Sequence, residues 1–176
     1  MADTTSITDC NFYSASEGGQ EEIFSDFLYF FDSDLNISNS GFEGSKSKYG
    51  GVYYDGEEND FIFSGSTYKN GVGITVGCMY IKGKATIKES ELVNNTNCIF
   101  IKDGVQHKID NTNFTGNSGY ALRGEDITGL TAISTIVDGH VGNSEWDLST
   151  ADSTTADKHG FELYRCDDTI ITDCTF

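Results

Sequence analysis

The chain has 176 residues, a length typical of one domain, and a formal net charge of −17 from 28 acidic and 11 basic residues. This charge disfavours nucleic-acid phosphates and anionic membrane surfaces, so we expect neither as a partner, and no apolar run reaches the ~18 residues of a membrane-spanning helix. With 20 glycines, 12 phenylalanines, 9 tyrosines and no proline, the composition indicates many short strands joined by tight turns.

One six-residue motif recurs along the chain: an apolar residue, two variable residues, Ser, Thr or Cys, one variable residue, and Phe, Tyr or Leu. Successive copies from Ile7 to Ile109 start 22 to 30 residues apart, which is the length of one turn of a parallel β-helix. In chain order the copies are Ile7–Phe12, Ile37–Phe42, Phe63–Tyr68, Ile87–Leu92, Ile109–Phe114 and Ile171–Phe176, with a weaker copy at Ala132–Val137.

A second apolar segment recurs between the motif copies, in most units directly after Gly or Asn. Its members are Leu28–Phe31, Gly51–Tyr54, Gly77–Ile81, Asn97–Ile101, Gly119–Leu122 and Gly160–Tyr164. The strands keep their length while the turns vary, as in a solenoid, whereas a leucine-rich repeat would need a leucine ladder and a β-sandwich more hairpin turns.

We therefore predict an all-β, right-handed parallel β-helix solenoid of about six to seven coils. It forms a single domain over residues 1–176, with an inserted loop at 140–158, where two copies lie farthest apart. Equivalent motif positions should stack inside the helix in two columns: Ile37, Phe63, Ile87 and Ile109 in one, and Phe42, Tyr68, Leu92 and Phe114 in the other.

The motif also carries a family resemblance. Leu92–Asn95 and Phe114–Asn117 fit a Phe-x-x-Asn element, and Tyr49–Tyr53 fits a Gly-Gly-Ala-Ile element. Over roughly residues 37–124 the chain thereby resembles the repeats of chlamydial polymorphic outer membrane proteins, within the pectin-lyase-like β-helix superfamily. The resemblance implies display at the cell surface and adhesion, so we expect an extracellular or cell-surface structural or adhesive module, with host or matrix glycans as candidate partners.

The alternative is a polysaccharide-active enzyme or a carbohydrate-binding module on the same fold. Inverting hydrolases need carboxylates held apart across a groove. Here the adjacent pair Asp167–Asp168 follows His159–Gly160, the reverse of the polygalacturonase order, and no Asn-Thr-Asp occurs. Neighbouring side chains on a strand point to opposite faces, so we expect the aspartate pair to lie in a turn. Because the carboxylate pattern of these hydrolases is missing, we expect that the chain is not an enzyme.

No catalytic, cofactor-binding or metal-ligating set stands out. Arg123 and Arg165 lie beside no evident aspartate cluster, which a lyase would need. His107, His140 and His159 are too scattered for a metal site and are expected at the surface. We expect no cofactor, although Ca²⁺ stays open as a partner of the acidic chain.

The cysteines fall in repeat positions. Cys78 and Cys98 occupy the same place in consecutive coils, ~4.8 Å apart, as a candidate disulfide or as two small inward-facing residues. Cys10 and Cys174 occupy the Ser/Thr/Cys position of the first and last motif copies. Copies at both ends favour head-to-tail stacking of subunits into a filament, or a chain that is part of a longer repeat protein.

Three candidate N-glycosylation sites complete the sequence features. They are the sequons at Asn36, Asn94 and Asn113. Asn36 and Asn113 each neighbour an apolar motif residue on a strand, so both should face outward. N-linked glycans are expected at these sites if the protein is secreted by a eukaryote.

Overall fold

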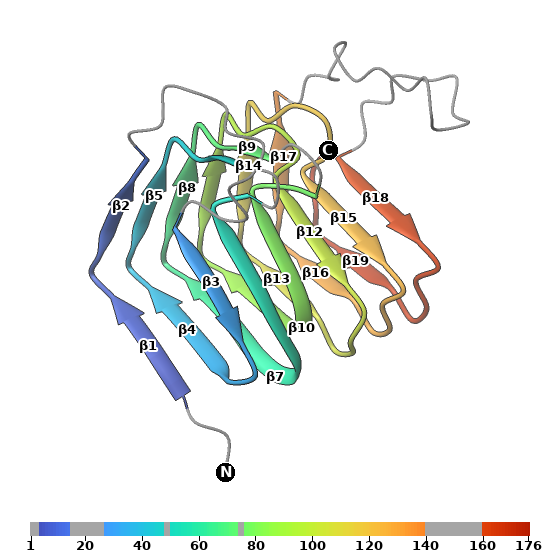
Figure 1. Ribbon diagram of the computed structural model, residues 1–176. Helices are drawn as coiled ribbons and strands as arrows, with labels where there is room; N and C mark the ends of the chain where they lie inside the picture. Colours follow the sequence, from blue (N-terminus) through green and yellow to red (C-terminus); the bar gives the residue numbers. More distant parts are fainter. Residues whose placement is uncertain (1–3, 15–26, 48–49, 74–75, 140–159) are drawn as a thin grey trace, which may run out of the picture.

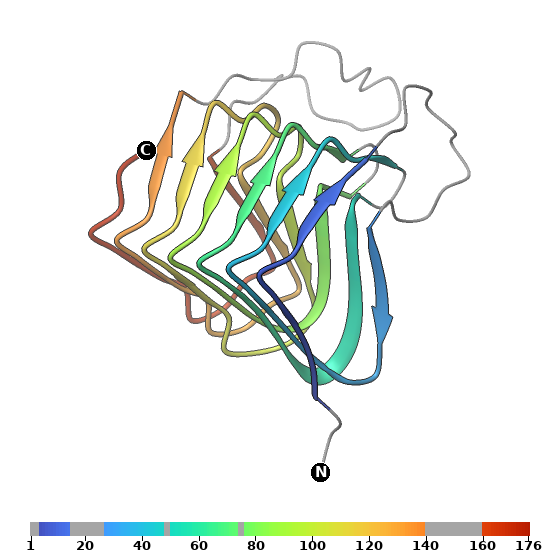
Figure 2. The ribbon, with the colours of Figure 1, turned by 90° about the vertical axis from the view of Figure 1, so that its left-hand side faces the viewer.

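The fold is a parallel β-solenoid, as predicted. The computed structural model describes residues 4–14, 27–47, 50–73, 76–139 and 160–176, which contain strands and no helix. Each strand pairs in parallel with its equivalent in the neighbouring coil. Seen from the N-terminal end, the chain turns clockwise as it recedes (Figure 2), so the helix is right-handed.

Three walls surround the core (Figure 1). The first wall consists of β3 (Leu28–Phe31), the start of β7 (Val52–Ser64), the start of β10 (Met79–Lys88), β12 (Ile99–Lys102), β15 (Leu122–Glu125) and β18 (Phe161–Tyr164). The second consists of β1 (Thr4–Thr8), β4 (Asp34–Ser38), the ends of β7 and β10, β13 (Lys108–Asp110), β16 (Thr131–Ile133) and β19 (Ile170–Thr172). The third consists of β2 (Asn11–Tyr13), β5 (Gly41–Glu43), β8 (Thr67–Lys69), β11 (Glu91–Val93), β14 (Asn113–Thr115) and β17 (Ile136–Asp138), and a short ladder joins β6 (Lys46–Ser47) to β9 (Val72–Gly73).

The number of coils differs from the prediction. The second wall has seven strands, but about four complete turns are present among the described residues, rather than six to seven. Residues 15–26 and 140–159 lie outside the described residues. The predicted loop at 140–158 falls in the second of these segments.

The two predicted core columns are confirmed. Ile87 lies in register with Phe63 on one side and Ile109 on the other, and Leu92 likewise lies between Tyr68 and Phe114. The eight side chains of these columns are at most 1% exposed: Ile37, Phe63, Ile87, Ile109, Phe42, Tyr68, Leu92 and Phe114. Burial of each such side chain is worth ~1.5–3 kcal/mol, so the columns supply much of the stability of the fold.

The corner between the second and third walls explains the Ser/Thr/Cys position of the motif. The residue before it has a positive φ in every copy: Asp9, Asn39, Gly65, Glu89, Asn111, Ser134 and Asp173. This left-handed conformation turns the chain sharply, and the next side chain then donates a hydrogen bond to the carbonyl two residues earlier. Ser40 Oγ lies 2.8 Å from Ser38 O, and Thr112 Oγ1 lies 3.0 Å from Asp110 O.

Candidate functional site

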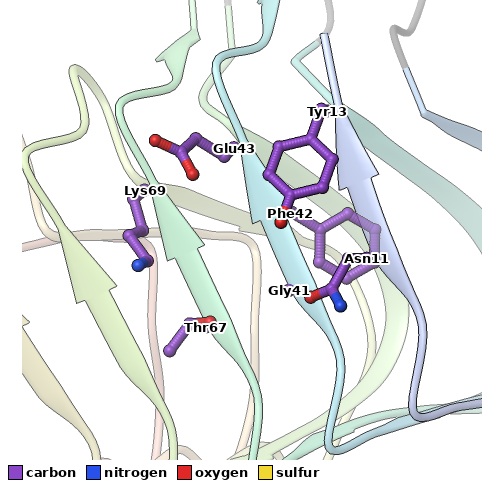
Figure 3. Close-up of a pocket in the computed structure, with 7 residues that line it drawn as sticks. All are labelled: Asn11, Tyr13, Gly41, Phe42, Glu43, Thr67 and Lys69. Atoms are coloured by element: carbon purple, nitrogen blue, oxygen red, sulfur yellow. The ribbon is translucent and has the colours of Figure 1, made fainter.

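A notch interrupts the outer surface of the third wall near its N-terminal end (Figure 3). Asn11, Gly41 and Thr67 stand side by side on β2, β5 and β8, because the parallel register pairs each with the next. Gly41 has no side chain, so a hollow of about 60 Å³ opens between its neighbours. A Cβ at Gly41 would lie 2.6 Å from Asn11 Oδ1, so any side chain there would fill the notch.

A second outward row forms the rim of the notch. Tyr13, Glu43 and Lys69 are paired in the same register, two residues farther along their strands. The ring of Tyr13 leans from β2 across β5 with one face toward the viewer (Figure 3), and 72% of this residue is exposed. Asn70 Nδ2 donates a hydrogen bond to Glu43 Oε1 at 3.2 Å, which holds the carboxylate at the rim.

The notch therefore combines five kinds of chemical group within one small surface. Asn11 offers an amide, Thr67 a hydroxyl, Glu43 a carboxylate, Lys69 an ammonium and Tyr13 an aromatic face. The two charges are opposite, so the site is neutral overall, in contrast to the chain as a whole. Sequence reasoning missed this site because it depends on the lateral register of three coils.

A column of aromatic side chains runs along the outside of the first wall and was also missed. We call it the aromatic column; its members are Tyr29, Tyr53, Tyr80 and Phe100. The rings of Tyr29 and Tyr80 each stack on Tyr53 with centroids 4.8 Å apart. The guanidinium of Arg123 covers Phe100, 5.2 Å from its centroid. The three tyrosine rings stack along the helix axis, so they cover each other's faces, whereas Phe100 meets Tyr80 edge to face.

Oppositely charged side chains also pair along the first wall. Lys82 Nζ lies 3.2 Å from Asp55 Oδ1, and Lys102 Nζ lies 3.7 Å from Glu125 Oε1. The guanidinium of Arg165 binds Asp126 and lies 3.4 Å from Glu125 Oε1. That hydrogen-bonded contact lowers the pKa of Asp126. These exposed pairs balance charge locally and contribute little stability.

The expectation of a surface position is wrong for His107, whereas His140 and His159 lie outside the described residues. His107 is 1% exposed, and its Nδ1 accepts a hydrogen bond from Ala85 N at 3.2 Å. Burial lowers the pKa of this imidazole. The ring therefore satisfies a backbone N–H of the neighbouring coil, which a sequence pattern does not reveal.

The aspartate pair lies in a turn, as expected. Asp168 has a positive φ and both carboxylates are exposed between β18 and β19. Among the residues that the structure describes, no three His, Cys, Asp or Glu side chains are grouped to hold a metal ion.

All four cysteines of the two predicted pairs are free thiols in the structure. Cys78 and Cys98 are fully buried free thiols on consecutive coils, and burial raises the pKa of each. Cys10 and Cys174 are also free, and they follow β1 and β19, the strands at opposite ends of the second wall. Their thiols make the same local contact: Cys10 Sγ lies 3.2 Å from Thr8 O, and Cys174 Sγ lies 3.3 Å from Thr172 O.

The three sequons occupy the outer surface to different degrees. Asn36 and Asn113 are half-buried, each beside buried neighbours on its strand. Asn94 is exposed and has a φ of 54°, at the turn that follows β11. Of the three, Asn94 is the most accessible to a modifying enzyme.

The end coils expose side chains that interior coils bury. Ile171 belongs to the column of Ile109, yet it is 43% exposed whereas Ile109 is fully buried. Phe176, in the Phe/Tyr/Leu position of the motif, is 63% exposed.

Comparisons with known proteins assign the chain to no family. No protein-family profile matches the chain, and no curated protein is significantly similar to it. The comparisons thus give no support to the resemblance to chlamydial repeats, and the structure bears out only the β-helix architecture. Within the described part of the chain, no helix is long and apolar enough to cross a membrane.

Proposed function

We propose that this chain is a structural β-solenoid module of an extracellular or cell-surface assembly, in which copies stack head-to-tail through their end coils. The observation that supports this proposal is the match between the two ends. The first and last motif copies differ at one position of six, Asn11 against Thr175. Their corner residues Asp9 and Asp173 have φ values of 55° and 54°.

Head-to-tail stacking would continue the hydrogen-bond ladder that joins the coils within one chain. At the interior corners, Asn111 N donates to Ile133 O of the next coil, and Ser134 N donates to Thr172 O. By the same pairing, Asp173 N of one copy would face Thr8 O of the next. A second copy in the opposite orientation would lose this parallel pairing, so the polarity of the ladder favours head-to-tail contact.

The same contact brings two like charges together. At this corner between the second and third walls, interior coils never place two acidic residues side by side, but a junction would set Asp173 beside Asp9. Like charges directly opposite each other destabilise a strand pair, and the net charge of −17 adds long-range repulsion. Assembly should therefore be weak at low ionic strength and strengthen as salt screens these charges.

The first test measures molecular mass by light scattering over a range of protein and salt concentrations. We expect the mass to rise with both, and Asp9→Asn to assemble at lower salt than the unchanged chain. Asparagine suits this corner, because Asn39 and Asn111 occupy it with positive φ in interior coils. Glu91→Gln is the matched control: it removes one charge from an exposed position on the third wall, away from the ends.

A monodisperse monomer would refute the proposal if it persisted for both the unchanged chain and Asp9→Asn at the highest protein and salt concentrations. Equal promotion of assembly by Asp9→Asn and Glu91→Gln would also count against it. That result would show that net charge, and not the junction, controls association.

The proposed role is non-enzymatic. Its support is that the carboxylates Asp55, Glu125 and Asp126 of the first wall each lie against a Lys or Arg side chain. Each carboxylate is oriented toward its cationic partner, and the pKa of Asp126 is lowered, whereas a general acid needs a raised pKa.

A further inference from the structure

We propose that the notch over Gly41 binds one neutral sugar unit of a glycan, with the ring of Tyr13 as its stacking surface. The inference does not rest on head-to-tail assembly: Asn11 and Tyr13 belong to the first coil, but their side chains point outward from the side wall (Figure 3).

The ring of Tyr13 differs from the other outward aromatic side chains in what it exposes. The C–H groups on one side of a pyranose ring pack best against a flat, accessible aromatic face. In the aromatic column, Tyr53 has a ring stacked on each of its faces. Tyr13 is 72% exposed and turns one face outward beside the hollow (Figure 3). Tyr29 stacks on Tyr53, and the guanidinium of Arg165 lies 4.5 Å from the ring centroid of Tyr164. The third wall thus offers a more open aromatic face than the first wall.

The polar groups around the hollow suit hydroxyl groups, which both donate and accept hydrogen bonds. Lys69 donates, Glu43 accepts, and Asn11 and Thr67 can do both. One carboxylate and one ammonium leave the site neutral, while the net charge of −17 repels anionic ligands. The observations therefore favour a neutral sugar over an acidic one.

Gly41 is not required by the backbone. Its φ lies outside the left-handed region, unlike that of Gly44 on the same coil, so another residue could adopt its conformation. The other outward residues of this row all carry side chains: Asn11, Thr67, Glu91, Asn113 and Ile136. The glycine therefore serves to open the notch rather than to shape the strand.

The size of the notch limits the ligand and its affinity. A hollow of about 60 Å³ is well below the ~300–1,000 Å³ of pockets that enclose a drug-sized molecule. It accepts one edge of a single sugar ring, so we expect a dissociation constant on the order of millimolar.

Saturation-transfer NMR with the methyl glycosides of glucose, galactose, mannose and N-acetylglucosamine tests the site. The methyl glycoside of galacturonic acid serves as the acidic comparison. We expect saturable binding of at least one neutral glycoside and weaker binding of the acidic one. Tyr13→Ala removes the stacking face and Gly41→Ala fills the notch, so each should abolish saturable binding. Circular dichroism checks that each variant is folded.

Two further variants distinguish binding at the notch from non-specific binding. Tyr13→Phe keeps the ring and should keep binding. Tyr164→Ala removes a tyrosine that is 53% exposed on another wall and should leave binding unchanged. The proposal is wrong if no neutral glycoside binds, if binding survives in folded Tyr13→Ala, or if the acidic glycoside binds more tightly than the neutral ones.

Discussion

At the scale of single residues, buried polar groups connect one coil to the next. The side chain of Asn95 accepts a hydrogen bond from Gly71 N at 2.8 Å and donates one to Tyr68 O at 2.9 Å, both in the preceding coil. His107 accepts one from Ala85 N of the preceding coil. Such groups satisfy backbone atoms at corners where the strands end, and an unsatisfied buried N–H costs ~1–3 kcal/mol.

His107 gives the stability of the fold a predictable dependence on pH. Burial lowers its pKa below the ordinary value of 6.5, so between these two pKa values the unfolded chain binds more protons than the folded one. Stability is then fully present above pH 6.5 and falls, by up to ~1.4 kcal/mol per pH unit, as the pH drops toward the folded pKa.

Urea unfolding of the unchanged chain and of His107→Gln across this range measures the effect. The glutamine oxygen can still accept from Ala85 N, but it does not titrate. We therefore expect a shallower pH dependence in the variant, with carboxylates contributing equally to both. Identical pH profiles would show that His107 is not the titrating group.

At the scale of elements, the repeat spacing predicts the core columns, but it does not predict the notch, which forms only when three strands pair side by side. The columns through Ile87 and Leu92 follow from motif spacing alone, because equivalent motif positions must stack. The notch depends on Gly41 lying between Asn11 and Thr67, which are 30 and 26 residues away. As one of 20 glycines in the chain, Gly41 carries no signal of its own until strand pairing is known.

Neighbouring positions on β10 offer a direct test of the core column. Ile87 is fully buried between Phe63 and Ile109, whereas the adjacent Lys88 is exposed. Ile87→Ala should lower the free energy of unfolding by ~2–5 kcal/mol, because it leaves a cavity in the core. Lys88→Ala should change it by less than ~0.5 kcal/mol. Similar losses for the two variants in urea unfolding would contradict the assignment of this column.

At the scale of the whole molecule, Cys10 and Cys174 report on the direction of stacking. Within one chain they follow the strands at opposite ends of the second wall, β1 and β19. In a head-to-tail junction they would occupy adjacent coils, ~4.8 Å apart, which is within the ~4.4–6.8 Å between the Cα atoms of a disulfide.

Glutathione disulfide, added under conditions that promote assembly, should therefore join the copies covalently. The two thiols lose two electrons and two protons, the cysteines form a disulfide, and two glutathione molecules are released. In a Cys166→Ser background, which removes the remaining accessible thiol, we expect a ladder of oligomers on non-reducing gels.

A chain that also carries Cys10→Ser keeps only Cys174 among its exposed or half-buried thiols, since Cys78 and Cys98 are fully buried. It can join two chains at most, so its ladder should stop at the dimer. A ladder in this variant as long as in the parent would contradict head-to-tail stacking, because the links would then pass through some other thiol.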